Sequence, residues 1–319
     1  MKASTMRELL VQAEETWGEK IVIRYKSGKG TVAEKSYTDL RKDSEHFSDL
    51  LETLKVRGGH VALIGPTSYE WILSYFGTVN SGSVAVPLDA SLPAADVCEL
   101  VDRADAVVLV ADEARKDVLE AARIQCPKLR YLISMQKTED GDGILALPKL
   151  MEMTLEEMEP GTGARADLQP DQLASILFTS GTTGKSKGVM LTHRNLAENA
   201  TCLDMKFPER SVLLSVLPVH HAYCLSMDIL KGISSGSVIC INDSLFRMAA
   251  NIKLFRPNIM LMVPMMIETL AKKLAAAGDK DPKMVKKAVF GEQFHTICSG
   301  GAYLQPELLD LFAKYDIAI

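Results

Sequence analysis

Residues 178–193 read FTSGTTGKSKGVMLTH and combine six hydroxyl side chains, three glycines and two lysines, with no acid. Glycines permit tight and left-handed turns, hydroxyls and exposed amides donate hydrogen bonds, and lysines bring positive charge. A short stretch of these residue types is suited to binding an anion, and phosphate is the natural candidate. A solvated turn is the alternative, because turns are rich in Gly, Ser and Thr for conformational reasons alone.

The closing residues GKS, 184–186, match the end of the phosphate-binding loop of P-loop NTPases. That motif requires a glycine where this chain has Thr179, and a helix that begins at its lysine so that the helix dipole faces the phosphates. Here GVML, residues 188–191, predicts a strand instead, and a helix is expected only after Thr192. The loop is therefore predicted to join two strands, and a P-loop-type NTPase is kept as an alternative function.

The longer string LFTSGTTGKSKGVMLTH closely resembles the phosphate-binding signature of adenylate-forming (AMP-binding) enzymes, which include acyl-CoA synthetases, aryl-CoA ligases, luciferases and peptide-synthetase adenylation domains. Three further strings match the family in the same order along the chain: LPVHHAYCLS, MLMVPMMIETL and CSGGAYLQPELL. One departure is that Ser186 precedes Lys187, where the family usually has proline; this relaxes φ at one loop position. The chain is identified as similar to the N-terminal part of an acyl-CoA synthetase.

The resemblance implies which residues hold the nucleotide. The residues expected to wrap its β- and γ-phosphates are Thr179, Ser180, Gly181, Thr182, Thr183, Gly184 and Lys187. The residues expected to lie against adenine and the acyl substrate are Gly300, Gly301 and Ala302. The residues expected to act in catalysis are His221, Lys187 and Thr182.

His221 falls where the family carries an aromatic or histidine side chain beside the α-phosphate and the substrate carboxylate. A neutral imidazole there can donate a hydrogen bond to either group. His220 is expected to be structural, and Lys185 is equally compatible with a phosphate contact and with facing water.

The implied reaction is a two-step ligation. A carboxylic acid reacts with ATP and Mg²⁺ to give acyl-AMP and pyrophosphate, and coenzyme A then takes the acyl group. Both steps concentrate negative charge, so donors and cations are needed where that charge develops. The text around residues 244–264 resembles long-chain fatty-acyl-CoA synthetases. Its methionines, Met260, Met262, Met265 and Met266, are compatible with core packing or with an adaptable acyl channel.

The fold class predicted is α/β, with two subdomains of largely parallel sheets flanked by helices, because short β-branched runs alternate with helical patterns. A Pro/Gly-rich stretch places the subdomains at residues 1–165 and 166–319, the second with the phosphate-binding loop. The last residues, DIAI, predict the start of a buried strand. The family's Mg²⁺ glutamate and its C-terminal domain with a catalytic lysine are absent from these residues, so no metal ligand is predicted and the isolated chain is expected to be inactive. A non-catalytic nucleotide-binding module is therefore a further alternative.

Composition restricts the partners. A net charge of −5 over 319 residues gives no general attraction to nucleic acid or anionic membranes, so any anion site must be local. The six cysteines are scattered singly, which favours a reducing, cytoplasmic location. No apolar run is long enough for a transmembrane segment. The resemblance implies that the partners are small molecules: a carboxylic acid, ATP and CoA.

Overall fold

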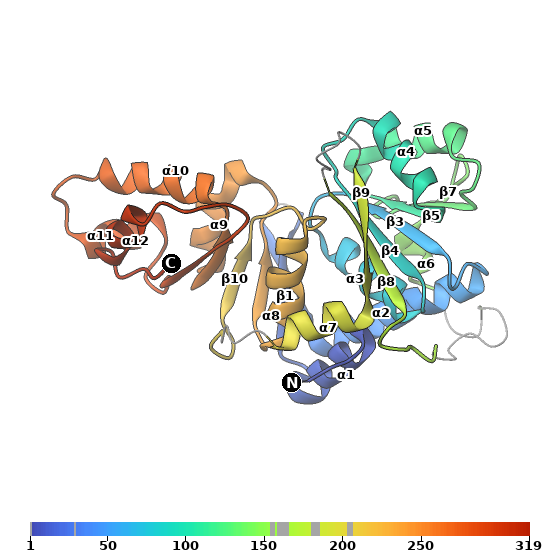
Figure 1. The fold of residues 1–319 in the computed structure, drawn as a ribbon, viewed down its shortest axis with the longest axis horizontal. Coiled ribbons are helices and arrows are strands. Elements are labelled where there is room, and N and C mark those ends of the chain that lie inside the picture. Colours follow the sequence, from blue (N-terminus) through green and yellow to red (C-terminus); the bar gives the residue numbers. More distant parts are fainter. Residues whose placement is uncertain (1, 29, 154–156, 158–165, 180–185, 203–206) are drawn as a thin grey trace. The chain divides into compact units, whose positions relative to one another are not determined.

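The computed structural model describes residues 2–28, 30–153, 157, 166–179, 186–202 and 207–319 (Figure 1). By compactness the chain divides into two units, and each contains one sheet with its own helices. The first unit comprises Met1–Lys20, Ser36–Cys202 and Pro218–Ala222, and the second comprises Ile21–Lys35, Leu203–Leu217 and Tyr223–Ile319. The predicted α/β class is confirmed.

The first unit contains a seven-stranded sheet. Its strands are β3 (His60–Ile64), β4 (Val84–Leu88), β5 (Ala106–Ala111), β6 (Tyr131–Ser134), β7 (Ile144–Ala146), β8 (Leu173–Thr179) and β9 (Lys187–Thr192). Its helices are α1 (Met6–Trp17), α2 (Tyr37–Thr53), α3 (Tyr69–Asn80), α4 (Ala94–Arg103), the 3₁₀ turn η1 (Glu113–Arg115), α5 (Lys116–Gln125), α6 (Leu147–Leu150) and α7 (His193–Cys202).

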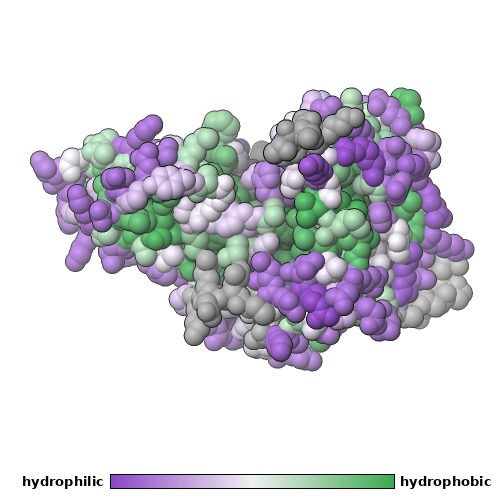
Figure 2. All heavy atoms as spheres, viewed as in Figure 1, coloured by the Kyte–Doolittle hydropathy of each residue, from purple (hydrophilic) through white to green (hydrophobic). Residues whose placement is uncertain are grey.

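The order of this sheet is β7-β6-β5-β3-β4-β8-β9, parallel except for the antiparallel pair β8 and β9. Strands β3, β4 and β5 read HVALI, VAVPL and AVVLVA, nearly continuous apolar runs typical of strands covered on both faces. Side chains of α4 and α5 join one core cluster with them, and α3 contacts β3 and β4. On the viewed face, green apolar residues gather over these strands, while α4 and α5 turn mostly hydrophilic residues outward (Figure 2).

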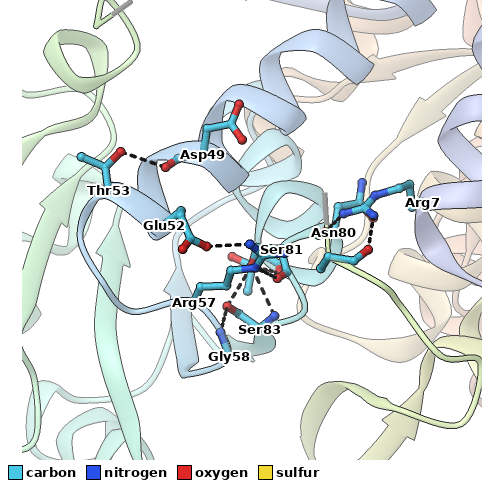
Figure 3. Close-up of polar contacts among 11 residues, drawn as sticks. Arg7, Asp49, Glu52, Thr53, Arg57, Gly58, Asn80, Ser81 and Ser83 are labelled. Atoms are coloured by element: carbon cyan, nitrogen blue, oxygen red, sulfur yellow. Dashed lines mark hydrogen bonds and ion pairs between the residues drawn. The ribbon is translucent and has the colours of Figure 1, made fainter. Parts of the chain in front are cut away.

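The C-terminal end of α3 is held by polar contacts (Figure 3). Arg57 donates from Nε to the carbonyl of Ser81 at 3.0 Å and pairs with Glu52 at 2.7 Å. Arg7 donates to the carbonyl of Asn80. Because the last carbonyls of a helix have no partner within the helix, these arginines satisfy groups that would otherwise need water. The contacts also fix the short turn that leads from α3 into β4.

The second unit contains a six-stranded sheet of order β13-β12-β10-β11-β1-β2. Its strands are β1 (Ile21–Ser27), β2 (Thr31–Ser36), β10 (Val212–Ser215), β11 (Val238–Ile241), β12 (Ile259–Met262) and β13 (Thr296–Ser299). Its helices are the π-helix η2 (Cys224–Leu230), α8 (Lys231–Ser234), the 3₁₀ turn η3 (Leu245–Arg247), α9 (Met248–Phe255), α10 (Pro264–Ala275), α11 (Pro282–Val289) and α12 (Glu307–Ala313).

Strands β1, β10, β11, β12 and β13 run parallel, and β2 follows β1 in the chain and lies beside it at the edge of the sheet. The predicted strand start in DIAI is seen as a parallel bridge between Ala318 and Thr296 of β13. Ile317 beside it is buried.

Two pairs of strands lie in a sheet whose other strands come from beyond the expected subdomain boundary at residue 165. Strands β1 and β2 lie in the sheet of β10–β13, and β8 and β9 lie in the sheet of β3–β7. Hydrophobic periodicity identifies a strand but not its neighbour, because pairing depends on contacts far apart in the sequence. The domain boundary at residue 165 therefore stays a prediction. Each of the two sheets contains strands from both sides of that residue.

Gly77 marks the close approach of α3 to α2. A Cβ at this position would lie 2.7 Å from the Phe47 side chain and 2.7 Å from the carbonyl oxygen of Ser44. We expect Gly77→Ala to lower the free energy of unfolding by roughly 1 to 2 kcal/mol, because overpacking outweighs the gain in helix propensity. Urea unfolding measures this. Gly141→Ala is the control, since its Cβ would meet only the flexible end of Lys137, and an equal loss in both variants would contradict the packing argument.

Candidate active site

The phosphate-loop signature lies on a β-hairpin of the first unit. Strands β8 and β9 are antiparallel, with Thr179 directly opposite Lys187 where the two strands meet the loop. Both residues are exposed, and the next helix begins only at His193. The prediction that the loop joins two strands is confirmed. In a P-loop NTPase a helix begins at the lysine, so this local geometry does not support that alternative.

Five of the predicted loop residues, Ser180, Gly181, Thr182, Thr183 and Gly184, lie outside the described residues. The two ends of the loop are described. Gly188 sits where a Cβ would come within 2.9 Å of Ile176, which explains why the second strand carries a glycine directly after its first residue. The hairpin is thus closely packed at the position where the loop leaves it.

Arg103, at the end of α4, was not singled out by the sequence but contacts both chain segments at the loop end of this hairpin, Phe178 of β8 and Ser186 before β9. Its Nη2 donates to the carbonyl of Ser186 at 2.7 Å, and its guanidinium lies 5.7 Å from the centre of the Phe178 ring. Glu99 is 3.6 Å away on the same helix. Arg103 therefore anchors the residue before Lys187 and brings a second positive charge to the hairpin end.

A pair of histidines lies in the same unit. The rings of His220 and His221 are 4.1 Å apart between centroids, and Nε2 of His220 lies 3.6 Å from Oδ1 of Asp89, which follows β4. Burial, with the charge of His221, lowers the pKa of His220 to about 4 despite the opposing effect of Asp89. His220 is consequently neutral near pH 7 and packs beside the exposed ring of His221. This arrangement fits the structural role expected for His220.

In the second unit, the GGA segment follows β13 and packs on an aromatic ring. A Cβ on Gly300 would lie 2.5 Å from the ring of Tyr223, so only glycine fits there without a shift. The Tyr223 hydroxyl donates to the carbonyl of Cys298 at 2.9 Å. Gly301 has φ of 85°, a left-handed conformation that favours glycine, and Ala302 is exposed. Tyr223 is therefore a supporting residue that the sequence did not single out.

Asp228 is a fully buried carboxyl group on the π-helix η2 of the second unit. Its Oδ2 accepts a hydrogen bond from Ser215 at 2.9 Å and lies 3.6 Å from Sγ of Cys224, and its Oδ1 has no hydrogen-bond partner. Burial raises the pKa of Asp228 to about 7, although Ser215 and Cys224 oppose that effect. An acid inside the apolar stretch CLSMDIL is the one sequence signal that could have drawn attention to it.

The loop end of the β8–β9 hairpin and the pair His220 and His221 carry groups that can bind an anionic substrate. The hairpin end supplies hydroxyl and cationic groups, and the histidine pair supplies a neutral ring donor. Among the residues that the structure describes, no group of three His, Cys, Asp or Glu side chains is arranged to hold a metal ion, and no helix is long and apolar enough to cross a membrane. The hydroxyl, lysine and imidazole donors of these residues suit phosphate or carboxylate oxygens.

Comparison with known proteins assigns the family. Residues 10–317 match the model of the AMP-binding enzyme family, so this chain belongs to that family. A relative is crotonobetaine/carnitine–CoA ligase of Escherichia coli O17:K52:H18 (strain UMN026 / ExPEC), 28% identical over 284 residues, covering 86% of this chain and 54% of that protein. The chain thus spans about half the length of the curated relatives it matches.

Solved structures support the fold. The inhibitor-bound N-terminal domain of FACL13 from Mycobacterium tuberculosis superimposes with a TM-score of 0.80 at 21% identity, covering 99% of this chain and 74% of that one. The adenylation domain of the carboxylate reductase GR01_22995 from Mycobacterium chelonae gives a TM-score of 0.83 at 21% identity, covering 98% and 56%. At these identities the likeness establishes the α/β fold and nothing finer.

The contact between Gly300 and Tyr223 yields a double-mutant prediction. We expect Gly300→Ala to cost about 2 kcal/mol of unfolding free energy, because its methyl group collides with the ring. In a Tyr223→Ala background the same change should cost at least 1 kcal/mol less. Urea unfolding of the four proteins measures the coupling. Equal costs in both backgrounds would show that the ring is not the obstacle.

The buried Asp228 predicts a pH dependence of stability. The pKa in the folded state, about 7, lies above the usual aspartate value of 3.8, so folding favours the protonated form and stability is lost as pH rises from about 4 towards 7. Asp228→Asn should remove that loss, and its stability relative to wild type should increase between pH 4 and pH 7 by roughly 2 to 4 kcal/mol. Chemical denaturation at several pH values measures the difference. A constant difference across this range would contradict a buried neutral acid.

Proposed function

We propose that this chain is the nucleotide-binding part of an AMP-forming acid–CoA ligase. It would activate a carboxylic acid with ATP and Mg²⁺ to acyl-AMP, which coenzyme A then converts to a thioester. The observation that carries the proposal is the hairpin of β8 and β9, which presents the family's signature loop between two strands with Thr179 opposite Lys187. Membership of the AMP-binding enzyme family supports it.

The roles follow from charge. The loop residues 179–184 and Lys187 hold the β- and γ-phosphates and offset the repulsion between a carboxylate and a triphosphate. His221 donates a hydrogen bond to the α-phosphate or the substrate carboxylate. Residues 300–302 lie against adenine and the acyl group. Mg²⁺ bound with ATP would supply positive charge that offsets the charge of the phosphates, and no residue of this chain is assigned as its ligand.

The acid is proposed to be a fatty acid on the sequence resemblance of residues 244–264. Met260 and Met262 are fully buried in β12, whereas Met265, directly after that stretch, is 74% exposed, so these three do not line one continuous channel wall. The support for a fatty acid therefore comes from the resemblance and not from a methionine channel. Because a relative is a crotonobetaine/carnitine–CoA ligase, these two short acids should also be tested as substrates. A cytoplasmic location is proposed with the activity.

Pyrophosphate exchange tests the proposal. Labelled pyrophosphate should enter ATP only when the correct acid is present, in the longest gene product that contains this chain, across a panel of fatty acids, crotonobetaine and carnitine. Lys187→Ala should lower the exchange rate about 100-fold, because it removes charge stabilisation at the phosphates. Lys272→Ala, on the exposed face of α10, is the matched control.

The alternatives give different products. A P-loop-type NTPase would release ADP without any acid, and a non-catalytic nucleotide-binding module would bind ATP without exchange. Either result would contradict the ligase. The 319-residue chain assayed alone is expected to give no appreciable thioester.

A further inference from the structure

Ser186 is the position at which this chain departs from the signature of its family. The family usually has proline before its lysine, and this chain has Ser186 before Lys187. Proline fixes φ at about −65°, whereas serine permits several backbone conformations. Any restriction of the backbone at this point must therefore come from the contacts that it makes.

Arg103 supplies such a contact. Its Nη2 donates to the carbonyl oxygen of Ser186 at 2.7 Å, a distance typical of a hydrogen bond from a charged donor. The contact joins the end of α4 to the loop end of the hairpin, although the two residues are 83 positions apart in the sequence. Because the accepting carbonyl belongs to the peptide group that links Ser186 to Lys187, the contact holds the backbone directly before the lysine.

The guanidinium group of Arg103 is itself held by two further contacts. Its central carbon lies 5.7 Å from the centre of the Phe178 ring, within the range of a cation–π interaction. Its Nη1 lies 3.6 Å from Oε1 of Glu99, which is four residues earlier on α4. These contacts restrict the side chain before it donates to Ser186, so less conformational entropy is lost when that hydrogen bond forms.

The residue after Lys187 is held by packing. Gly188 pairs with Phe178 in the β8–β9 ladder. A Cβ on Gly188 would lie 2.9 Å from Ile176 and 3.5 Å from the Phe178 ring, so this backbone lies directly against both side chains. Lys187 therefore stands between a closely packed glycine and Ser186, whose carbonyl is hydrogen-bonded.

We propose that Arg103 is a positioning residue for Lys187, and that its hydrogen bond to Ser186 takes the place of the family's proline in fixing the backbone before the lysine. The proposal rests on the proposed function in one respect, that Lys187 binds the phosphates of ATP. Arg103 acts through the peptide group that it holds and not through a contact with the nucleotide. Holding this peptide group in the binding conformation raises the affinity for ATP and leaves the chemical step unchanged.

Titration calorimetry with ATP, on the longest gene product that contains this chain, tests the proposal. Arg103→Ala should raise the Kd for ATP about 10-fold, because a hydrogen bond from a charged donor is lost. The pyrophosphate exchange rate at saturating ATP should fall by less than about threefold, which separates a positioning residue from a catalytic one. Arg103→Lys keeps a charged donor on a more flexible side chain, so its Kd should rise only about threefold.

Ser186→Pro separates backbone positioning from an effect of charge. In the Arg103→Ala background it should return the Kd for ATP to within about threefold of the wild-type value, because proline restricts the same backbone. In the wild-type background it should change the Kd by less than about twofold, because the hydrogen bond already holds that backbone. The two substitutions are thus expected to be strongly non-additive.

Arg130 offers a matched control in the same unit. Its Nη1 donates to the carbonyl of Lys55 at 2.8 Å, and its guanidinium lies 5.9 Å from the centre of the Tyr131 ring. Arg130 directly precedes β6, which is separated from β8 by β5, β3 and β4 in the sheet. Arg130→Ala therefore removes the same kinds of contact at a distance from the hairpin, and it should change the Kd for ATP by less than about twofold.

Hydrogen exchange of residues 187–190 without nucleotide gives a readout that needs no activity. Arg103→Ala should speed exchange in this segment about 10-fold, because the backbone before Lys187 is released. Adding Ser186→Pro should reverse most of that change, and Arg130→Ala should leave the segment as it is in the wild type.

Three results would overturn the proposal: an unchanged Kd in Arg103→Ala, an equal loss in Arg130→Ala, or weakened binding in Arg103→Ala that Ser186→Pro does not restore. The last result would assign the loss to the positive charge of Arg103. Failure of the proposed function would look different, because wild-type protein would then show no acid-dependent pyrophosphate exchange while ATP binding and hydrogen exchange still depended on Arg103. Circular dichroism confirms that each variant is folded, so a loss of binding is not a loss of structure.

Discussion

The antiparallel pairing of β9 with β8 is the interaction on which the candidate site depends. β8 is itself held in the parallel sheet by β4, through the register of Ala85 with Ser175 and a 2.9 Å hydrogen bond from the Ser175 hydroxyl to the Ala85 carbonyl. The hairpin therefore extends from a buried core, and its outer end places Thr179 opposite Lys187. This ladder fixes the distance between Thr179 and Lys187, the two described residues from which the loop extends.

A second constraint operates within the other unit, where β10, η2 and the GGA segment are held by polar and aromatic contacts. The buried carboxyl group of Asp228 accepts a hydrogen bond from Ser215, and its neighbour on the same helix, Cys224, donates to the carbonyl of Leu217 at 3.2 Å. Tyr223 precedes Cys224 and supports Gly300. A π-helix is rare and frequently occurs at functional sites, and η2 begins directly after the LPVHHAY motif in the chain.

Charge in this protein is organised locally rather than globally. Although the net charge of the chain is −5, Lys187 and Arg103 lie near each other at the loop end of the β8–β9 hairpin, and Lys253 and Arg256 are exposed on α9 and at its end. Lys187 is exposed on β9, whereas Arg103 lies 3.6 Å from Glu99 and Arg247 lies 3.2 Å from Asp243, so part of this local charge is paired. Net charge therefore predicts little about where this chain would meet an anion.

The sequence by itself determined the α/β class, the hairpin that carries the loop and the adenylate-forming resemblance, because apolar periodicity and a specific string of Gly, Ser, Thr and Lys are local properties. Only the tertiary structure decided that β1 and β2 join β10–β13 and that β8 and β9 join β3–β7. It also brought Arg103 to the hairpin, placed the Tyr223 ring under Gly300 and buried Asp228. These outcomes depend on contacts between residues distant in the chain, and such contacts cannot be predicted from any short stretch of sequence.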